Sequence, residues 1–420
     1  MSFKKEFGFK RLTQVDEALE KYLKLFKSID ESETVETINS LNRVLTKDIK
    51  SPEDIPPFNR SAMDGYAVRS IDVSGASESS PVRLKLVGYS TTSNPFNGSM
   101  GQCEAVRIDT GARMPEGADS VVMLEYTRRV GDYIEVFKQV SPYENVSLRG
   151  EDVRKGDVIV YGGILLTPYD IACLINAGIY EVEVFRKVKV GLAAVGSELL
   201  DFPSELPEGM VREVNRINIK YYLSMYYPVE FKDYGIIPDD HDRVRKVVEK
   251  GIEENDVMIT IGGSSLGKGD VVTDIAENLG NIIVHGVALY PSRPVLLSEM
   301  SGKPYIGVPG YPVAAAVTAR VFLEPVIMKL AGIRGVLVEG RVKGRLSRRV
   351  SSRIGFRHYV RVKLKPSKDG FVVEPIYTSG AGILSSLSLG DGYLIIPEDV
   401  EGYEAGDEVE VILYRRVIKV

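Results

Sequence analysis

A glycine-rich segment of the sequence has the composition of an anion-binding loop. Residues 261–270 read IGGSSLGKGD, after the apolar run DVMITI and before a run with helical spacing. Glycines let backbone N–H groups approach an anion, and the start of a helix favours negative charge. We therefore expect a phosphate to bind here through Gly262, Gly263, Ser264, Ser265, Gly267 and Lys268.

The same segment is a near match to the P-loop pattern, but it departs from that pattern at one position. Gly269 stands where the P-loop has the Ser or Thr that binds magnesium. Asp270 follows directly, and a carboxylate beside phosphates is expected if it holds a metal ion. No G-x-G-x-x-G pattern occurs, so a dinucleotide-binding fold has no support. The segment predicts phosphate binding without predicting the P-loop NTPase fold.

Three further segments are expected at the end of a strand or close to one. Glu198 follows the apolar run VKVGLAAV, where it could hold a hard cation such as Mg²⁺ or could cap a helix. Pro309 and Pro312 enclose a rigid turn after the run PYIGV, and such a turn needs no function. Arg293, shortly before it, carries a guanidinium suited to an oxyanion.

Two polar segments lie earlier in the chain. The segment 57–67 reads PFNRSAMDGYA, in which Asp64 is either a turn residue or part of a binding loop. The segment 108–112 reads IDTGA, in which Thr110 offers a hydroxyl beside a glycine, although a plain loop between strands fits equally well. Residue chemistry alone thus indicates a magnesium-dependent site for a phosphate ester or nucleotide.

The pattern of the remaining sequence predicts the elements that position these segments. Residues 13–50 have helical spacing at Leu19, Leu23 and Phe26, with Thr13 and Asp16 as a helix start. Strands and helices alternate in the middle of the chain, which predicts a mostly parallel sheet with helices on both faces. We expect a multidomain α/β protein with these parts: an elongated helical and linker domain (1–50 plus 146–186), a β-rich domain (51–145), a three-layer α/β domain (187–331) and a C-terminal β-barrel-like domain (335–420).

Composition excludes several classes of partner. The net charge is −5, which gives no basic footprint for nucleic acid. The sequence has neither a signal peptide nor an apolar run long enough to span a membrane. Cys103 and Cys173 form no metal-binding pair and, with only three histidines, predict buried apolar roles and no zinc site. We expect a cytoplasmic protein.

The five segments, in this order, resemble the MoeA family, which includes the E domain of gephyrin. The family versions are close to SAMDGYA, TGAxxPxGAD, TGxEL, GGxSxGxxD and PGNP, and the resemblance covers nearly the whole chain. It implies an elongated homodimer of four-domain subunits whose α/β domain has a MogA-like fold. It also implies the molybdopterin molybdenumtransferase reaction, in which molybdate or tungstate enters adenylated molybdopterin, AMP is released and Mg²⁺ assists. A MogA-type protein or an acceptor enzyme is the further partner that it implies.

The resemblance assigns roles to individual residues. Asp64, Thr110, Glu198 and Asp270 match the catalytic positions, and Pro309 and Pro312 match the prolines of PGNP. Glu198, Asp270 and Asp240, or its neighbour Asp239, match the acidic positions that hold Mg²⁺. The family site is shared between subunits, so Asp64 and Thr110 are expected to face Glu198 and Asp270 across the dimer.

The chain departs from the family where lysines usually precede the last turn. Gly286 and Tyr290 stand at two lysine positions, and only Arg293 keeps a charge. An oxyanion needs cations or donors that offset its desolvation, and Lys268 or His285 could replace the lost lysines. The alternative is a paralogue that binds molybdopterin or its adenylate as a scaffold or carrier without inserting metal. An unrelated magnesium-dependent nucleotide enzyme is the third hypothesis.

Overall fold

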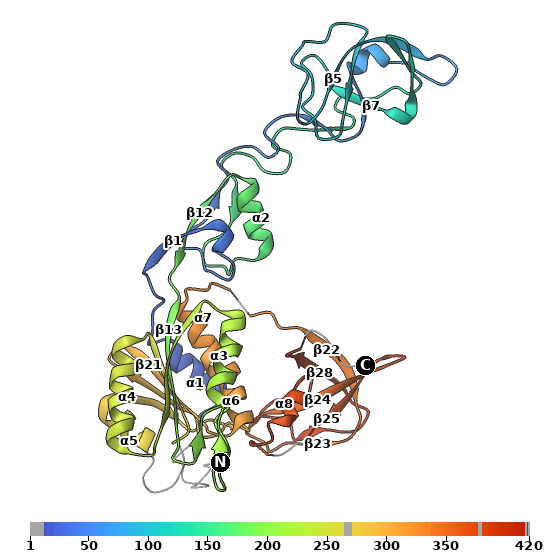
Figure 1. Cartoon of the computed structure of the whole chain (residues 1–420). Helices are drawn as coiled ribbons and strands as arrows, with labels where there is room; N and C mark the ends of the chain where they lie inside the picture. Colours follow the sequence, from blue (N-terminus) through green and yellow to red (C-terminus); the bar gives the residue numbers. More distant parts are fainter. Residues whose placement is uncertain (1–11, 264–270, 336, 377–379, 416–417, 419–420) are drawn as a thin grey trace.

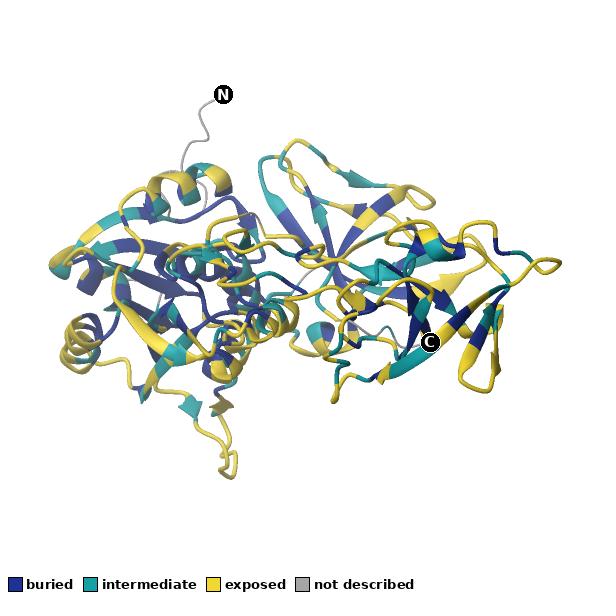
Figure 2. Cartoon of the chain, turned by 90° about the horizontal axis from the view of Figure 1, so that it is seen from above, coloured by how far each residue is buried: buried dark blue, intermediate teal, exposed yellow. Residues whose placement is uncertain are grey.

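The computed structural model describes residues 12–263, 271–335, 337–376, 380–415 and 418. The chain is elongated: an α/β domain and a C-terminal barrel lie at one end, a small β-rich domain lies at the other, and a narrow linker domain joins them (Figure 1). Buried residues gather along the strands, while exposed residues cover the loops and outer helix surfaces (Figure 2). The predicted fold class is confirmed. The residue limits proposed for each domain stay predictions.

The α/β domain is built on a six-stranded sheet. Its first four strands pair in parallel and the last two pair antiparallel. Seven of the eight residues of the second strand, and all five of the third, are buried, which is typical of parallel strands covered on both faces. In sheet order the strands are β16 (Val229–Ile237), β13 (Val188–Val195), β17 (Val257–Ile261), β21 (Lys303–Val308), β20 (Leu296–Met300) and β18 (Asn281–His285).

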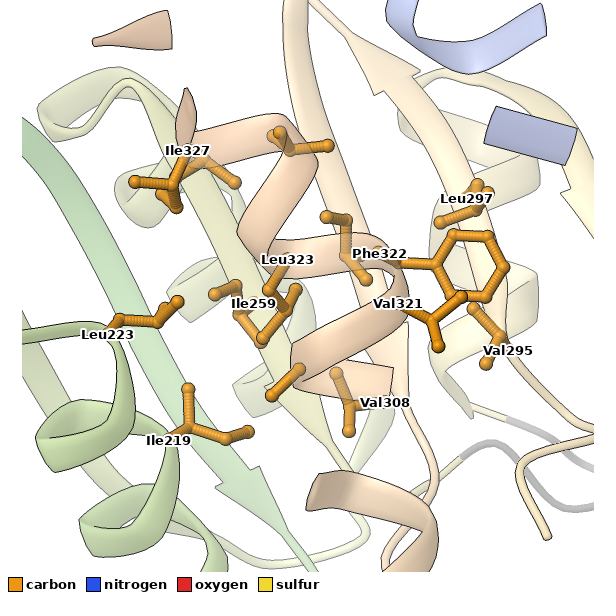
Figure 3. Packing of buried hydrophobic residues seen from close by; sticks show 14 of the residues in the cluster. Ile219, Leu223, Ile259, Val295, Leu297, Val308, Val321, Phe322, Leu323 and Ile327 are labelled. Atoms are coloured by element: carbon orange, nitrogen blue, oxygen red, sulfur yellow. The ribbon is translucent and has the colours of Figure 1, made fainter. Parts of the chain in front are cut away.

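Helices cover both faces of this sheet. Leu192 of β13 belongs to the core on one face, and Val195 belongs to the core on the other. Figure 3 shows Leu223 and Phe322 among the side chains packed around Ile259. The first face carries α1 (Val15–Leu23), α3 (Asn215–Tyr226) and the continuous run α6 (Pro312–Thr318), η4 (Ala319–Leu323, a π-helical turn) and α7 (Glu324–Leu330); the second carries α4 (His241–Glu254) and α5 (Val271–Leu279).

The predicted helix over 13–50 is wrong beyond residue 23. After α1 the chain forms β1 (Ser32–Glu36), which pairs antiparallel with β12 (Glu181–Phe185). This partner lies far along the sequence, so helical spacing near residue 20 could not reveal it. The helix starts slightly later than expected, because Gln14 rather than Thr13 holds the cap position; Asp16 lies in the first turn as expected and forms an ion pair with Arg357. The linker domain also contains η1 (Thr37–Asn39), β2 (Ile49–Lys50), β11 (Val158–Val160) and α2 (Pro168–Asn176).

The β-rich domain contains a second six-stranded sheet. Its strand order places β4 between β7 and β6, and Gly65 at the start of β4 lies opposite Ile108 at the end of β6. The residues just before β4 and just after β6 therefore meet at one edge. In sheet order the strands are β7 (Ser120–Met123), β4 (Gly65–Val68), β6 (Glu104–Ile108), β5 (Val82–Ser90), β9 (Tyr133–Val136) and β8 (Thr127–Val130).

The C-terminal sheet closes into a barrel because β24 pairs with both β25 and β26. A short strand of the α/β domain, β19 (Leu289–Tyr290), adds to β24 and joins the two domains. The barrel strands are β22 (Arg341–Leu346), β24 (Arg357–Ser367), β25 (Gly370–Pro375), β26 (Gly392–Ile396) and β28 (Glu408–Leu413). The short elements not yet named are β3 (Arg60–Ser61), η2 (Ser70–Val73), η3 (Leu124–Tyr126), β10 (Val146–Ser147), β14 (Leu199–Leu200), β15 (Val211–Arg212), β23 (Val350–Ser351), α8 (Ser385–Leu389) and β27 (Gly402–Tyr403).

Two expectations from composition can be compared with the structure. Cys103 is exposed and Cys173 is half-buried, so the buried role predicted for Cys103 is wrong. Cys103 lies in a surface turn with a positive φ of 55°, before β6, where nothing demands an apolar side chain. None of the helices in the described residues combines the length and apolar character needed to cross a membrane.

The central strand β13 should carry much of the stability of the α/β domain. Replacing Leu192, which is fully buried, by Ala should lower the free energy of unfolding by about 2–5 kcal/mol, because a cavity remains in the core. Urea unfolding followed by circular dichroism measures this change. Lys189→Ala on the same strand is the control: its side chain is exposed, so its effect should stay within about 0.5 kcal/mol. Equal effects of the two substitutions would contradict the placement of β13.

Candidate functional site

One edge of the α/β sheet gathers most of the polar segments of that domain. The register aligns Val195 with Ile237, Ala194 with Ile261, and Ile261 with Val308. Leu296, at the start of antiparallel β20, lies opposite Gly307, so the turn before β20 reaches the same edge. In open α/β sheets, ligands bind at the carboxyl ends of the parallel strands. The structure therefore brings the turns that hold Glu198, Gly262, Pro309 and Arg293 to one edge.

The acidic end of this edge contains Glu198 and Asp239. Ser197 N–H donates to Asp239 Oδ2 at 2.8 Å, and Asp239 N–H donates to Ser197 Oγ at 3.0 Å. Asp240 instead accepts a hydrogen bond from the backbone N–H of Arg243 at 2.9 Å and caps α4. Glu198 caps no helix, because the strand β14 follows it. Of the two neighbouring aspartates, Asp239 is thus the one joined to the turn that carries Glu198.

Glycines hold the turns after β13, β17 and β21 against one another. Gly262 has φ +87°, and a Cβ on it would lie 2.4 Å from the carbonyl oxygen of Val195. A Cβ on Gly310 would lie 3.4 Å from Gly262 Cα. Only glycine fits at position 262, for conformational and steric reasons together. The other expected residues of this loop, Ser264, Ser265, Gly267, Lys268 and Asp270, lie outside the described residues.

Asn215, a residue that the sequence reasoning missed, supports the turn between Pro309 and Pro312. Its Nδ2 donates to the carbonyl oxygen of Gly310 at 2.7 Å, while its buried Oδ1 has no hydrogen-bond partner among the described residues. Pro312 begins α6, as its fixed φ favours. An asparagine before a helical pattern usually indicates a cap, so no local pattern could reveal this long-range contact.

Asp64 and Thr110 form a single unit in the β-rich domain. Asp64 Oδ1 accepts hydrogen bonds from Thr110 N–H at 2.7 Å and from Thr110 Oγ1 at 2.9 Å. These two bonds hold the pKa of Asp64 below its ordinary value, and the bond from the backbone N–H has the larger effect. Arg107 Nη1 donates to the carbonyl oxygens of Gly65 at 2.8 Å and Ile108 at 2.7 Å, which ties the two loops together. The structure thus brings these two predicted residues into contact.

The two halves of the expected site lie apart within one chain. Asp64 directly precedes β4, which pairs with β7, and β7 lies at the far end of the molecule from β21 in Figure 1. Because Figure 1 is a projection, β7 and β21 are at least as far apart in the molecule as they are in the picture. Asp64 and Thr110 therefore do not contact Glu198 or Asp239 of the same chain.

A cavity of about 460 Å³ separates Arg293 from the barrel. Arg293 and Arg353 approach the Phe356 ring, with guanidinium carbons 5.9 and 5.4 Å from its centroid. Ser352 Oγ is buried and has no hydrogen-bond partner in the part of the chain that the structure describes. The sequence reasoning predicted Arg293 but missed Arg353, because the barrel loop that carries it adjoins this edge only in three dimensions. The lining residues are Tyr290, Arg293, Ser351, Ser352, Arg353, Phe356 and His358.

Arg361 is a buried cation next to this region. Its guanidinium donates to Ser386 Oγ at 3.1 Å and to the carbonyl oxygens of Tyr359 at 3.4 Å and Gly380 at 3.3 Å. These acceptors are neutral, and burial lowers the pKa of Arg361. Within the described ranges these are its only acceptors, and a buried cation bonded to neutral groups favours a nearby anion. An arginine within the apolar run HYVRVKL was the signal that the sequence reasoning overlooked.

The donor set at the acidic end suits a hard cation. Glu198 and Asp239 offer carboxylate oxygens, which Mg²⁺ prefers. Within the part of the chain that the structure describes, no three His, Cys, Asp or Glu residues gather closely enough to hold a metal ion. Any complete ligand set at this edge therefore needs a group from Asp270, from substrate or from water.

The contact between Asp64 and Thr110 gives a measurable prediction. Thr110→Val removes the hydroxyl donor and leaves the backbone donor, so the pKa of Asp64 should rise part of the way to its ordinary value. NMR titration of ¹³C-labelled aspartate carboxyl groups measures it. Thr110→Ser keeps the hydroxyl and should leave the pKa low; an unchanged pKa in Thr110→Val would contradict the bond.

Comparisons with known proteins cover the whole of this architecture. Family models described as "MoeA N-terminal region (domain I and II)", "Probable molybdopterin binding domain" and "MoeA C-terminal region (domain IV)" match residues 13–178, 191–329 and 343–414. A molybdopterin biosynthesis protein of Methanocaldococcus jannaschii is 36% identical over 96% of both chains. A molybdopterin molybdenumtransferase of Staphylococcus aureus is 32% identical over 90% of both. The crystal structure of a molybdopterin biosynthesis moeA protein from Pyrococcus horikoshii has a TM-score of 0.84 and 33% identity, and the match covers 96% of this chain and 100% of that one.

Proposed function

The chain belongs to the MoeA family, the molybdopterin molybdenumtransferases of molybdenum cofactor biosynthesis, and we propose that it inserts molybdate or tungstate into adenylated molybdopterin with release of AMP. The proposal rests on one observation: a single edge of the sheet brings together the carboxylates of Glu198 and Asp239, the contact between two glycine turns and the guanidinium of Arg293. The scaffold alternative is not favoured, because relatives that match over 90% or more of the chain include proteins named molybdopterin molybdenumtransferase.

We assign the phosphoanhydride of the substrate to the middle of this edge. The backbone N–H of Gly263 is the described donor at this point, since that of Gly262 donates to the carbonyl oxygen of Val308 at 2.9 Å. The positive φ of both Gly262 and Gly263 opens the backbone to the phosphate oxygens. Glu198, Asp239 and Asp270 are the residues that would hold Mg²⁺, which supplies positive charge to the phosphate oxygens when bound. Asp239 replaces Asp240 in this assignment, because Asp240 caps α4.

We place the oxyanion at the other end of the edge, where the α/β domain meets the barrel. Arg293 and Arg353 line the cavity there, and Tyr290, which also lines it, interacts electrostatically with Arg361. These guanidinium groups supply the positive charge that the missing lysines at Gly286 and Tyr290 would otherwise give. They also bind tetrahedral oxyanions through several donors at once, which suits both molybdate and tungstate.

We further propose that the protein works as a cytoplasmic homodimer whose site is shared between subunits. Asp64 and Thr110 of one subunit then face Glu198 of its partner and help to position the oxyanion, as neither can reach Glu198 of its own chain. Ile217, Tyr221 and Met225 recur at every fourth residue on α3, with 47%, 64% and 64% of their surface exposed. Such an apolar stripe supports association of subunits. A MogA-type protein or an acceptor enzyme stays a proposed partner.

A shared site predicts complementation between two inactive variants. Asp64→Asn and Glu198→Gln should each abolish AMP release from adenylated molybdopterin in the presence of Mg²⁺ and molybdate. Subunits mixed and reassociated at random should recover about a quarter of the wild-type rate, because half of the dimers are hybrids with one intact site each. AMP is measured by chromatography.

The matched control mixes two variants from the same half of the site. Glu198→Gln with Asp239→Asn leaves every site of a hybrid damaged, so the mixture should stay inactive. Recovery in this control, or no recovery in the first mixture, would contradict a site that is shared between subunits.

The oxyanion assignment predicts a selective kinetic defect. Arg293→Ala should raise the KM for molybdate by about tenfold or more, the loss expected for a charge-assisted hydrogen bond, while the affinity for adenylated molybdopterin is kept. Metallated cofactor formed at varied molybdate and tungstate concentrations measures it. Arg293→Lys keeps the charge, so its KM for molybdate should lie between those of the wild type and Arg293→Ala. A loss of affinity for adenylated molybdopterin as large as the loss for molybdate would place Arg293 elsewhere in the site.

A further inference from the structure

We propose that residues 199–212 of one subunit, here called the acidic arm, dock on a basic face of the β-rich domain of a second copy of this chain. The basic face consists of Phe58, Arg60, Met63 and Arg113. This contact would hold Asp64 and Thr110 over Glu198 of the partner subunit. The inference rests on the proposed shared site and adds the surface that assembles it.

The acidic arm leaves the sheet edge directly after Glu198. It returns through β15, which pairs with β14, and Val211 N–H donates to the carbonyl oxygen of Glu198 at 2.8 Å. Every residue from 201 to 209 is exposed. Its apolar side chains are exposed as well, with 78% of Phe202, 44% of Leu206 and 54% of Val211 open to solvent. Apolar surface displayed in this way on a projecting loop is typical of an interface.

The charges of the arm are also unsatisfied. Glu205 and Glu208 form no ion pair with any residue that the structure describes. Asp201, by contrast, pairs with Arg216 at 2.7 Å, which fixes the base of the arm to α3. The outer part of the arm therefore presents two free carboxylates between apolar side chains.

The basic face has the complementary composition. Arg60 and Arg113 lie opposite each other in a β-bridge, and both are exposed. Neither side chain forms an ion pair within the described ranges. Phe58 and Met63 beside them each leave 41% of their surface exposed. Arg60 interacts electrostatically with Glu151, although the two form no ion pair. Two like charges held side by side still repel each other, so this face favours an acidic partner.

The position of the two surfaces identifies the partner as a second copy. Arg60 and Met63 precede Asp64 on one loop, Arg113 follows Thr110 on the other, and the arm begins at Glu198. Any arrangement that brings Asp64 to Glu198 therefore also brings the basic face to the arm. Within one chain the two surfaces lie at opposite ends of the molecule (Figure 1), so only another subunit can supply the contact.

The test is a reversal of charge on each surface. Glu205→Lys with Glu208→Lys, or Arg60→Glu with Arg113→Glu, places like charges opposite each other in the dimer. Each pair should raise the dimer dissociation constant, measured by sedimentation at low salt without substrate, by about tenfold or more. The chain with all four substitutions restores opposite charges and should recover most of the wild-type affinity. Added salt should weaken the wild-type dimer and reduce the effect of either reversal.

A matched control changes the same amount of charge elsewhere. Glu253→Lys with Glu277→Lys alters exposed residues in the last turns of α4 and α5, at the opposite edge of the sheet. This variant should keep the wild-type dissociation constant. An arm reversal that behaves like this control, or a fourfold variant no better than the single reversals, would overturn the proposal.

A cross-link supplies a readout that does not depend on stable charge variants. In a Cys103→Ser background, which removes the exposed thiol, Glu205→Cys with Arg113→Cys should join two subunits through a short bismaleimide. Monomer alone after treatment would overturn the contact. The AMP assay tests the proposed function separately. A cross-linked dimer that releases no AMP would contradict the proposed reaction but support docking of the acidic arm. Active hybrid dimers that form no cross-link would contradict docking of the arm but support the shared site.

Discussion

The parallel pairing of β13, β17 and β21 is the constraint on which the rest of the α/β domain depends. Both faces of these strands are buried, so a slip of one residue would turn core side chains toward the wrong layer, and the register is fixed. A fixed register makes the strands end level, and level ends bring Glu198, Gly262 and Gly310 to one edge. The polar chemistry of this domain is thus a consequence of apolar packing beneath it.

The barrel and the β-rich domain complete this edge in different ways. The barrel is attached directly, through β19 on β24 and through the bond from Val313 N–H to the carbonyl oxygen of Ala381, and it brings Arg353 and Arg361 close to the edge. The β-rich domain carries an equally well-ordered unit, Asp64 with Thr110, but at the far end of the chain. One half of the proposed site is therefore built by packing within the chain, and under the proposed function the other half would come from a second subunit.

Local patterns in the sequence were sufficient wherever function depends on a strand and the turn that follows it. The apolar runs before Glu198, Gly262 and Pro309 predicted their meeting, since the carboxyl ends of parallel strands share an edge. Patterns failed where distant residues decide the outcome. The strand β1 exists because β12 pairs with it, Asn215 matters because Gly310 lies beside it, and Arg361 is notable because α8 and the loop at Gly380 cover it. The choice between Asp239 and Asp240 also required the structure, because both precede α4 and only hydrogen bonds distinguish them.

The two chain segments that connect the β-rich domain run beside each other. The strand β2 pairs with β11, Ile55 pairs with Val153, and β3 pairs with β10, all antiparallel. The domain therefore enters and leaves through neighbouring points, as an insertion does, and the linker is a double strand rather than a single tether. A double strand resists deformation more than a single chain does, because two hydrogen-bonded backbones must move together. The position of Asp64 relative to the α/β domain is thus restricted by paired backbone.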